Sequence, residues 1–532
     1  MLILELLYLL SVTLLAIYGL NTWLHAWLYW RYCRPTGAPS QPADQGSDDF
    51  SRRSGLRTTE VVTTARTTGV VTTPGTPGSD DFSRRADAPL VTVQLPIYNE
   101  RHVVVRLIEA AANLDWPAGR LQIQVLDDST DETTAMIAAA LAGRGHPGIR
   151  LEQVRRPERQ GFKAGALQYG LATATGEFIA IFDADFVPPP DFLKQTIPCF
   201  ADPSVGCVQT RWGHVNPDTS WLTKAQALGI DGHFVVEQHA RHAIGAFLNF
   251  NGTAGVWRRA CLEEAGGWQG DTLTEDLDLS YRAQLRGWRI VYRPEVVVPA
   301  ELPVQIDALK RQQFRWAKGS LQTALKLLGA LWRSPRPVWL KVMSTLHLTN
   351  YAVHPLMALN LLLLLPMTFS DNFILRLTPL FTFSAIGPPL MYWTAMQARA
   401  APWPVRLRRL ALLVALGVGL SINNTKAALE ALAGIRSEFK RTPKFAVTDQ
   451  STRWQSSAYT LPRDPTVWVE FGLALYALGL LGYSLSLGLW SLIFWLALYA
   501  GGYSYITYLS FRQTWQLHVA RAAQMRLRAF EP

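Results

Sequence analysis

Charged residues are scarce in this chain. They make up 17% of its 532 residues, against about 25% in an average soluble domain. Hydrophobic residues reach 49%, and 19 residues are tryptophan. This balance argues against an ordinary soluble protein and indicates a membrane protein of two or more domains.

Cysteine is scarce as well, and no compact basic run is present. The four cysteines (Cys33, Cys199, Cys207 and Cys261) form no CxxC pair and no ligand-spaced cluster, so we expect them to be reduced and structural. The 51 Lys and Arg exceed the 41 Asp and Glu by ten charges. Without a compact basic run, this excess suits membrane lipid or an anionic substrate, and we expect no nucleic-acid partner.

The first long apolar run covers residues 6–30, about the length of a bilayer span. No basic stretch precedes it and no small-residue cleavage site follows, so we expect an anchor and not a signal peptide. Arg31 and Arg34 come next, which puts the following domain in the cytoplasm by the positive-inside rule. We therefore predict a multi-pass protein of the inner or plasma membrane.

Residues 35–88 are repetitive. The stretch GSDDFSRR occurs at 46–53 and again at 78–85. Such Ser-, Thr-, Gly- and Pro-rich sequence buries too little apolar surface to offset the entropy lost on ordering, so we predict a disordered linker. A docking or regulatory tether is the alternative.

Residues 89–304 have the pattern of an α/β domain. Strand-like VTVQLP, IQVLDD and FIAIFDAD alternate with helix-like stretches, which predicts βαβ units and a mostly parallel sheet. Ligands of such sheets bind beyond the carboxyl ends of the strands. Acidic and polar side chains stand at these ends in three strands, so we expect them to meet in one crevice.

The rest of the chain alternates membrane and surface segments. Long apolar runs at 343–367, 373–396, 466–486 and 488–511 predict two pairs of spans. The apolar run 410–422 is short and turns polar, which favours an amphipathic helix on the cytoplasmic surface. With four C-terminal spans, the basic segments 399–409, 436–444 and 512–528 all lie inside.

We accordingly divide the chain as follows: an N-terminal transmembrane helix (1–34), the linker (35–88), the cytoplasmic domain (89–304), interfacial helices (305–342), a transmembrane pair (343–398), a cytoplasmic interfacial helix with a basic loop (399–464), a second transmembrane pair (465–512) and a basic cytoplasmic tail (513–532).

Two aspartates separated by one residue, Asp183 and Asp185, follow the strand-like run IAIF. Like charges this close repel each other unless a cation lies between or beside them. Mg²⁺ takes one or two carboxylates together with phosphate oxygens, so a divalent cation bound with a diphosphate fits this pair. A turn that uses aspartate for backbone capping is the alternative, and the pair alone is a weak signal.

Further motifs accompany this pair: LPIYNER, IQVLDDSTDE, KAGAL, FNGTAGVWRR, EDLDLSYRAQLRGW and RQQFRW. With them, residues 89–330 resemble the processive family 2 glycosyltransferases of the cellulose synthase and hyaluronan synthase superfamily. The chain looks most similar to the plant cellulose synthase-like A enzymes, which make mannan or glucomannan, and their bacterial relatives. The repetitive linker has no part in this resemblance.

The resemblance implies a glycosyltransferase A-type α/β domain inserted in an α-helical transmembrane protein. It further implies an inverting hexosyltransferase that uses a nucleotide sugar, UDP-glucose or GDP-mannose, with Mg²⁺ or Mn²⁺ as cofactor. The acceptor would be a growing β-linked glucan or mannan, translocated through the enzyme's own transmembrane bundle. A glycolipid synthase acting once on a lipid acceptor, and a non-catalytic channel, remain alternatives.

Carried over position by position, the resemblance assigns roles to these residues. The catalytic base would be Asp276. Donor-binding residues would be Tyr98, Glu100, Asp127, Asp128, Lys163 and Asp183, and the metal ligands Asp183 and Asp185. Acceptor-binding residues would be Glu275, Gln312, Arg315 and Trp316, although Trp316 could instead be an interfacial belt residue.

A basic stretch, FKRTPK, partly matches the gating loop of cellulose synthases. Phe439, Thr442 and Lys444 fit the pattern, whereas Arg441 stands where valine is expected. A plain basic cytoplasmic loop is the alternative.

Overall fold

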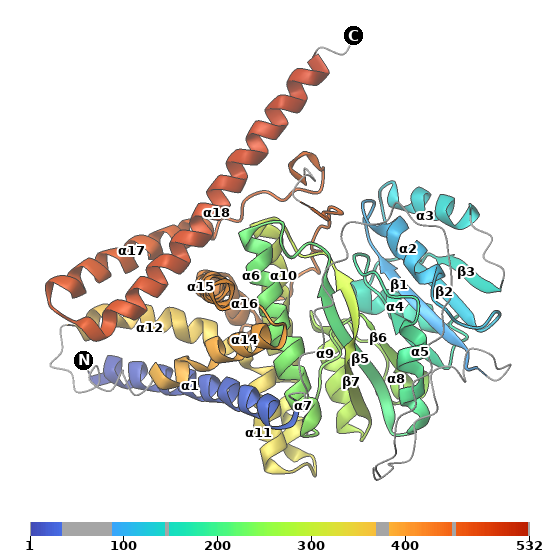
Figure 1. Cartoon of the computed structure of the whole chain (residues 1–532), viewed down its shortest axis with the longest axis horizontal. Helices are drawn as coiled ribbons and strands as arrows, with labels where there is room; N and C mark the ends of the chain where they lie inside the picture. Colours follow the sequence, from blue (N-terminus) through green and yellow to red (C-terminus); the bar gives the residue numbers. More distant parts are fainter. Residues whose placement is uncertain (1, 34–87, 144–147, 369–381, 450–453, 530–532) are drawn as a thin grey trace, which may run out of the picture.

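The computed structural model describes residues 2–33, 88–143, 148–368, 382–449 and 454–529. An α/β domain lies on the right of Figure 1 and a set of long helices on the left. The predicted linker 35–88 lies outside the described residues, apart from Ala88 at its end.

The α/β domain is built on a seven-stranded sheet of order β3-β2-β1-β4-β6-β5-β7. Its strands are β1 Val91–Ile97, β2 Leu121–Asp127, β3 Ile149–Val154, β4 Phe178–Ile181, β5 Val205–His214, β6 Gly255–Arg258 and β7 Arg289–Ala300. The pairs β1–β2, β1–β4, β2–β3 and β5–β7 are parallel, whereas β6 runs antiparallel to both β4 and β5. The prediction of a mostly parallel sheet is thus confirmed, and β6 is the exception.

Helices cover both faces of this sheet. They are α2 Val104–Ala112, α3 Thr133–Ala142, α4 Phe162–Leu171, α5 Phe192–Thr196, η2 Ile197–Ala201, α8 Arg259–Glu264 and α9 Glu275–Leu285. Neighbouring residues of β4 pack into two different hydrophobic cores, one on each face of the sheet. Ala180 packs with Val93 and Leu95. Ile179 packs with Leu167 and Trp257. Burial on both faces explains why the strands have near-continuous apolar sequences.

A helical segment joins the sheet to the long helices. It consists of α6 Trp221–Asp231, the π-helical η3 Gly232–Gln238 and α7 His239–Ala243. α6 packs against α14 (Gly387–Ala398) and α15 (Trp403–Gly419), and η3 packs against α14. This segment therefore fixes the sheet relative to the helices.

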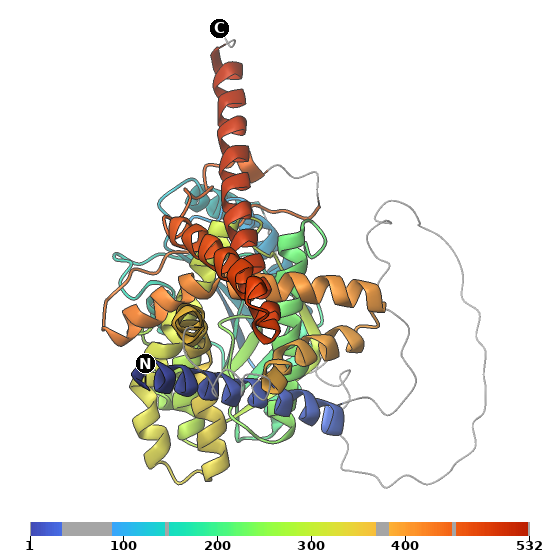
Figure 2. The same cartoon turned by 90° about the vertical axis from the view of Figure 1, so that its left-hand side faces the viewer.

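Four helices among the described residues are long and apolar enough to cross a membrane: Leu2–Cys33, Asn350–Met367, Val467–Ser486 and Trp490–Ala523. They contain α1 Leu2–Leu28, η1 Tyr29–Cys33, η4 Asn350–Ala352, α12 Val353–Met367, α17 Val467–Ser486 and much of α18 Trp490–Ala529. Each overlaps a predicted span. Figure 2, viewed from their side, shows these helices in front of the α/β domain.

Two predicted segments differ in detail. Of the span 373–396, residues 373–381 lie outside the described residues, and the described part consists of a short helical stretch at 382–385 followed by α14, a helix of 12 residues. The predicted surface helix 410–422 becomes two helices, α15 and α16 Ser421–Leu432, neither of which is among the candidate spans. The basic tail is the continuation of α18, which projects away from the rest of the molecule in Figure 1.

The segment 305–342, predicted as interfacial helices, forms one long helix, α10 Ile306–Arg333, followed by α11 Val338–Leu348. α10 packs against α9 of the α/β domain and against α16, α11 and α18. A buried ion pair fastens it to α17, with 2.6 Å between Lys310 Nζ and Glu470 Oε2. This helix therefore couples the α/β domain to the apolar helices.

Candidate active site

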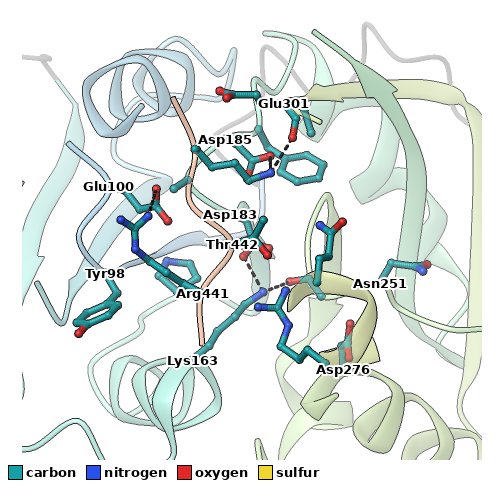
Figure 3. A pocket seen from close by; sticks show the side chains of 18 of the residues that line it. Tyr98, Glu100, Lys163, Asp183, Asp185, Asn251, Asp276, Glu301, Arg441 and Thr442 are labelled. Carbon is teal, nitrogen blue, oxygen red and sulfur yellow. Dashed lines mark hydrogen bonds and ion pairs between the residues drawn. The ribbon is translucent and has the colours of Figure 1, made fainter. Parts of the chain in front are cut away.

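A cavity of about 170 Å³ lies beyond the carboxyl ends of β1, β2 and β4, closed on the other sides by α9, α10 and the segment 439–444. Figure 3 labels residues of the cavity that follow β1 and β4, together with residues of α9 and of the segment 439–444. The residues of the prediction that line it are Tyr98, Glu100, Asp128, Lys163, Asp183, Asp185, Glu275, Asp276, Gln312, Arg315, Trp316, Phe439, Thr442 and Lys444.

Asp127 is the one predicted residue that does not line the cavity. Its buried carboxylate accepts hydrogen bonds from the Ser129 backbone N–H, at 2.8 Å, and from Gln153 Nε2, at 2.9 Å. These bonds hold the turn after β2. The same turn carries Asp128 to the cavity. The Asp128 carboxylate accepts two hydrogen bonds from the Arg156 guanidinium, at 2.8 and 2.7 Å.

Each aspartate of the Asp183–Asp185 pair has a lysine partner. Lys163 Nζ lies 2.6 Å from Asp183 Oδ1, and Lys444 Nζ lies 2.7 Å from Asp185 Oδ2. The strand β4 ends at Ile181, and the Asp183 backbone N–H donates instead to Thr253 Oγ1, at 2.8 Å. Repulsion between the two carboxylates is thus relieved by cations from two distant segments, α4 and the 439–444 segment.

Asp276 lies in the first turn of α9, next to Lys163 and Gly252. Desolvation and the neighbouring Glu275 carboxylate raise the pKa of Asp276 to about 7, while the Lys163 ammonium opposes the rise. Gly252 has a φ of +81°, and a Cβ there would sit 2.9 Å from Asp276 Oδ2. Glycine is favoured at this place because the positive φ would strain any other residue and a Cβ would press on the Asp276 carboxylate.

Lys163 lies between Asp183, which follows β4, and Glu275 at the start of α9. Besides Asp183 it donates to the Gly252 carbonyl, at 2.9 Å, and lies 3.8 Å from Glu275 Oε1. Burial acts to lower the pKa of Lys163, but the Asp183 and Glu275 carboxylates outweigh it and the pKa is raised. This ammonium is therefore a fixed positive charge at the centre of the site.

α10 brings Gln312, Arg315 and Trp316 to the cavity wall. It can approach α9 so closely because Gly319 has no side chain: a Cβ there would sit 2.7 Å from the Thr274 backbone N. Arg315 lies over the Phe439 ring, 4.4 Å from its centroid, and desolvation lowers the pKa of its guanidinium.

The segment 439–444 lines the cavity and contacts both α10, through Phe439 and Arg315, and the end of β1, through Arg441 and Glu100. Phe439 stacks on Phe162, with ring centroids 6.0 Å apart. Arg441, the departure from the gating pattern, pairs with Glu100 at 3.1 Å and lies 4.2 Å from the ring centroid of Tyr459. Burial raises the pKa of Glu100 to about 8, against the opposing charge of Arg441.

Several lining residues received no role in the sequence analysis, among them Arg159, Asn251, Glu301 and Arg441. Arg159 lies over the ring of Tyr98, 3.5 Å from its centroid. The Glu301 carboxylate accepts from the Phe445 N–H at 2.9 Å. Asn251 lies in FNGTAG and Arg441 in FKRTPK, whereas Arg159 and Glu301 stand in no motif, so for these two the sequence offered only their charge as a signal.

Known proteins resemble most of this site. Residues 88–319 match the family described as glycosyltransferase-like family 2, and residues 260–385 match the family described as cellulose synthase. The probable glucomannan 4-beta-mannosyltransferase 7 of Oryza sativa subsp. japonica is 47% identical over 244 residues, which are 45% of this chain and 42% of the relative. Glucomannan 4-beta-mannosyltransferase 2 of Arabidopsis thaliana is 44% identical over 260 residues, 48% of this chain and 49% of the relative.

The match thus spans about half the length of these curated relatives. Among solved structures, the mannosyltransferase PcManGT from Pyrobaculum calidifontis, in complex with GDP-Man and Mn²⁺, is 23% identical with a TM-score of 0.46, covering 67% of this chain and 93% of that chain. The two family matches together run from the first strand of the sheet to beyond α12, and they include every motif that lines the cavity except the segment 439–444. Residues 88–319 of this chain thus carry a glycosyltransferase-like family 2 domain, and residues 260–385 carry the cellulose synthase match that overlaps its end.

Proposed function

We propose that this protein transfers hexose, with inversion, from a nucleotide sugar to a β-linked polysaccharide, with mannose from GDP-mannose as the first choice and glucose from UDP-glucose as the second. The observation that carries the proposal is the convergence of Lys163, Asp183 and Asp276 in one cavity of a family 2 domain. The mannose preference follows the names of the curated relatives. Those relatives do not favour the glycolipid synthase alternative.

Asp276 is the base in this proposal. An inverting transfer needs one group that removes the acceptor proton as the hydroxyl attacks the anomeric carbon. A carboxylate whose pKa is near 7 suits this task, because it is ionised at neutral pH yet basic enough to take the proton. Lys163 and Arg315 offset the negative charge that develops on the departing diphosphate.

Asp183 and Asp185 fit a divalent cation. They offer hard oxygen ligands beside one another, and the Asp183 side chain is 34% exposed at the cavity. The described residues contain no group of three or more His, Cys, Asp or Glu that could hold a metal alone. A Mg²⁺ or Mn²⁺ held by one or two carboxylates and completed by the donor's phosphates is consistent with that. Bound there, the metal would supply charge to neutralise the diphosphate.

The segment 439–444 gates the cavity in this proposal. A cavity of about 170 Å³ is smaller than the roughly 300–1,000 Å³ of sites that enclose drug-sized ligands. Withdrawal of the segment would widen the cavity for a nucleotide sugar and would free Asp185 from Lys444 and Glu100 from Arg441. In this state the segment occupies the donor site.

The α/β domain lies on the cytoplasmic side of the membrane in this proposal. The basic segments 399–409 and 436–444 are then on the same side as the donor, which is made in the cytoplasm, and the product leaves through the helices. Membrane lipid surrounds α1, α12, α17 and α18.

The test is to incubate the purified full chain with Mn²⁺ and either GDP-mannose or UDP-glucose, and to identify the product by linkage analysis and NMR. We expect a β-linked polymer, made faster from GDP-mannose. An α-linked product, a single hexose on lipid, or no transfer from either donor would contradict the proposal.

A further inference from the structure

Arg159 covers one face of the Tyr98 ring at the wall of the active-site cavity. Its guanidinium carbon lies 3.5 Å from the centroid of that ring and 4.9 Å from the centroid of the Phe162 ring. Tyr98 and Arg159 both line the cavity, whereas Phe162 does not. The reaction proposed above gives Arg159 no task, although Arg159 lies against a residue expected to bind the donor.

The donors of the Arg159 guanidinium make no hydrogen bond among the described residues. Its Nε lies 3.9 Å from Asp128 Oδ2. Asp128 is instead bonded twice by Arg156, which also donates to the Phe162 carbonyl, at 2.7 Å. The Arg156 side chain is 7% exposed, and that of Arg159 is 27% exposed. Arg156 therefore supports the fold, whereas the donors of Arg159 are available to a ligand in the cavity.

The place of Arg159 suits the base of a nucleotide better than its diphosphate. In the proposed reaction, Lys163 and Asp183 already supply a cation and a metal ligand for the diphosphate. Tyr98 offers an aromatic face, and nucleobases stack on such faces. A base on this face displaces the guanidinium, but the Arg159 main chain stays in place, because its carbonyl accepts the N–H of Phe162, the first residue of α4, at 3.3 Å. The displaced guanidinium is then left at the edge of the base.

A guanidinium at the edge of a base distinguishes guanine from uracil. Its fork of N–H groups pairs with two neighbouring acceptors, and guanine presents such a pair in O6 and N7. Uracil has no such pair, because the N3–H donor separates its O2 and O4 acceptors. Adenine carries a donor amino group where guanine has O6. Of the two donors considered above, GDP-mannose therefore suits Arg159 and UDP-glucose does not.

We propose that Arg159 selects the donor by its base: the guanidinium leaves the Tyr98 ring, a guanine stacks in its place, and the guanidinium donates to O6 and N7 of that guanine. The assignment rests on the proposed function and makes Arg159 the residue that prefers GDP-mannose to UDP-glucose. Arg159 takes no part in the chemical step. Its loss therefore weakens binding of the donor and leaves the transfer itself intact.

The first measurement is calorimetric binding of GDP, UDP and 7-deaza-GDP to the purified full chain with Mn²⁺. The last of these keeps O6 of guanine but has a C–H group in place of N7. We expect GDP to bind the wild type about tenfold to a hundredfold more tightly than UDP, the scale of one bidentate pair between arginine and guanine. We expect 7-deaza-GDP to bind severalfold more weakly than GDP, because it offers the fork only one acceptor.

Two substitutions of Arg159 separate the fork from the charge. Arg159→Lys keeps the positive charge but replaces the fork by a single ammonium. We expect it to bind GDP about tenfold more weakly and UDP as the wild type does. Arg159→Met removes every donor, so GDP and 7-deaza-GDP should bind to it equally. Retained UDP binding shows that a variant is folded.

Arg155 provides the matched control. It is an arginine of the same loop, paired with Asp127 at 3.7 Å, and it does not line the cavity. Its side chain is 53% exposed, so lysine fits there without strain. We expect Arg155→Lys to leave all three affinities unchanged.

Turnover tests the same selection during catalysis. We expect Arg159→Lys to raise KM for GDP-mannose about tenfold with little change in kcat, because a contact to the base is the same before and during the transfer. KM for UDP-glucose should stay as in the wild type.

The outcomes for the base and for the reaction are distinguishable. If Arg159→Lys weakens GDP and UDP equally, Arg159 serves the diphosphate and the selection of guanine is overturned, while sugar transfer leaves the proposed function standing. Equal wild-type binding of GDP and 7-deaza-GDP, tighter binding of UDP, or no binding of GDP overturns the selection as well. Failure of transfer from both donors contradicts the proposed function alone, since the binding comparison does not depend on turnover.

Discussion

At the scale of single residues, the proposed chemistry depends on Asp276, a carboxyl group whose pKa is raised to about 7 by its surroundings. Asp276 receives opposing influences: desolvation and Glu275 raise its pKa, and Lys163 lowers it. Glu275 and Asp276 are adjacent in the sequence, so their two carboxyl groups are always close together. The sequence thus places a carboxyl group with a raised pKa at the start of α9, as the proposed base requires.

The pH dependence of the rate tests this environment. Asp276 accepts a proton only when it is ionised, so the rate should fall as the pH drops below about 7, by about tenfold for each unit well below the pKa. The measurement is kcat/KM for the donor across about pH 5.5 to 8.5.

Glu100, whose pKa is raised to about 8, could produce an inflection of its own. The Glu100→Gln variant separates the two, because an inflection due to Asp276 persists in it. A flat profile between pH 5.5 and 8, or an inflection near 7 that vanishes in Glu100→Gln, would show that Asp276 does not control the rate.

At the scale of elements, the site depends on how closely α10 approaches α9. Gly319 allows this approach, because a Cβ there would meet the Thr274 backbone N at 2.7 Å and its Cγ2 at 2.5 Å. Gln312, Arg315 and Trp316 lie one to two turns earlier on the same helix. The placement of these side chains relative to Asp276 is therefore set by a residue that does not itself line the cavity.

We expect Gly319→Ala to displace α10 and to lower turnover by about a hundredfold, because a shift of about 1 Å at reacting groups has effects of that order. Gly329 on the same helix is the control, since its Cβ would meet only the end of a flexible arginine, at 3.7 Å. Gly329→Ala should keep full turnover and should stabilise the helix by roughly 0.5–1 kcal/mol. Equal turnover in the two variants would contradict this account of α10.

Elements also show what the sequence can and cannot predict. β1, β2 and β4 were predictable because strands buried on both faces are nearly continuous apolar runs, and the motif residues at their ends meet as expected. β6 could not be predicted in this way. It has only four residues, and its place between β4 and β5 depends on antiparallel pairing with strands distant in the sequence. The pairing of Lys163 with Asp183 and of Lys444 with Asp185 likewise depends on tertiary contacts.

At the scale of the whole molecule, the account requires the α/β domain and the segment 439–444 on one side of the membrane. The turn between α17 and α18 must then lie on the other side. Three exposed positions report on this: Glu158 of the α/β domain, Lys440 of the segment and Ser486 at the end of α17.

Single cysteines at these three positions, in a chain whose Cys33 and Cys199 are replaced by alanine, should label from opposite sides in sealed vesicles. We expect Glu158→Cys and Lys440→Cys to react from the cytoplasmic side and Ser486→Cys from the other. Reaction of Lys440→Cys and Ser486→Cys from the same side would mean that α17 does not cross the membrane.

The central claim is that donor binding and proton removal belong to different carboxylates of one cavity. The most direct measurement compares calorimetric binding of GDP and Mn²⁺ with sugar turnover in Asp183→Asn and Asp276→Asn. Asp183→Asn should lose binding, because it removes a charged ligand of the metal and the partner of Lys163. Asp276→Asn should bind GDP and Mn²⁺ almost as the wild type does, yet turn over about 10²–10⁴-fold more slowly, the contribution of a general base. If Asp276→Asn lost binding as severely as Asp183→Asn, or kept full turnover, the assignment of Asp276 as the base would be wrong.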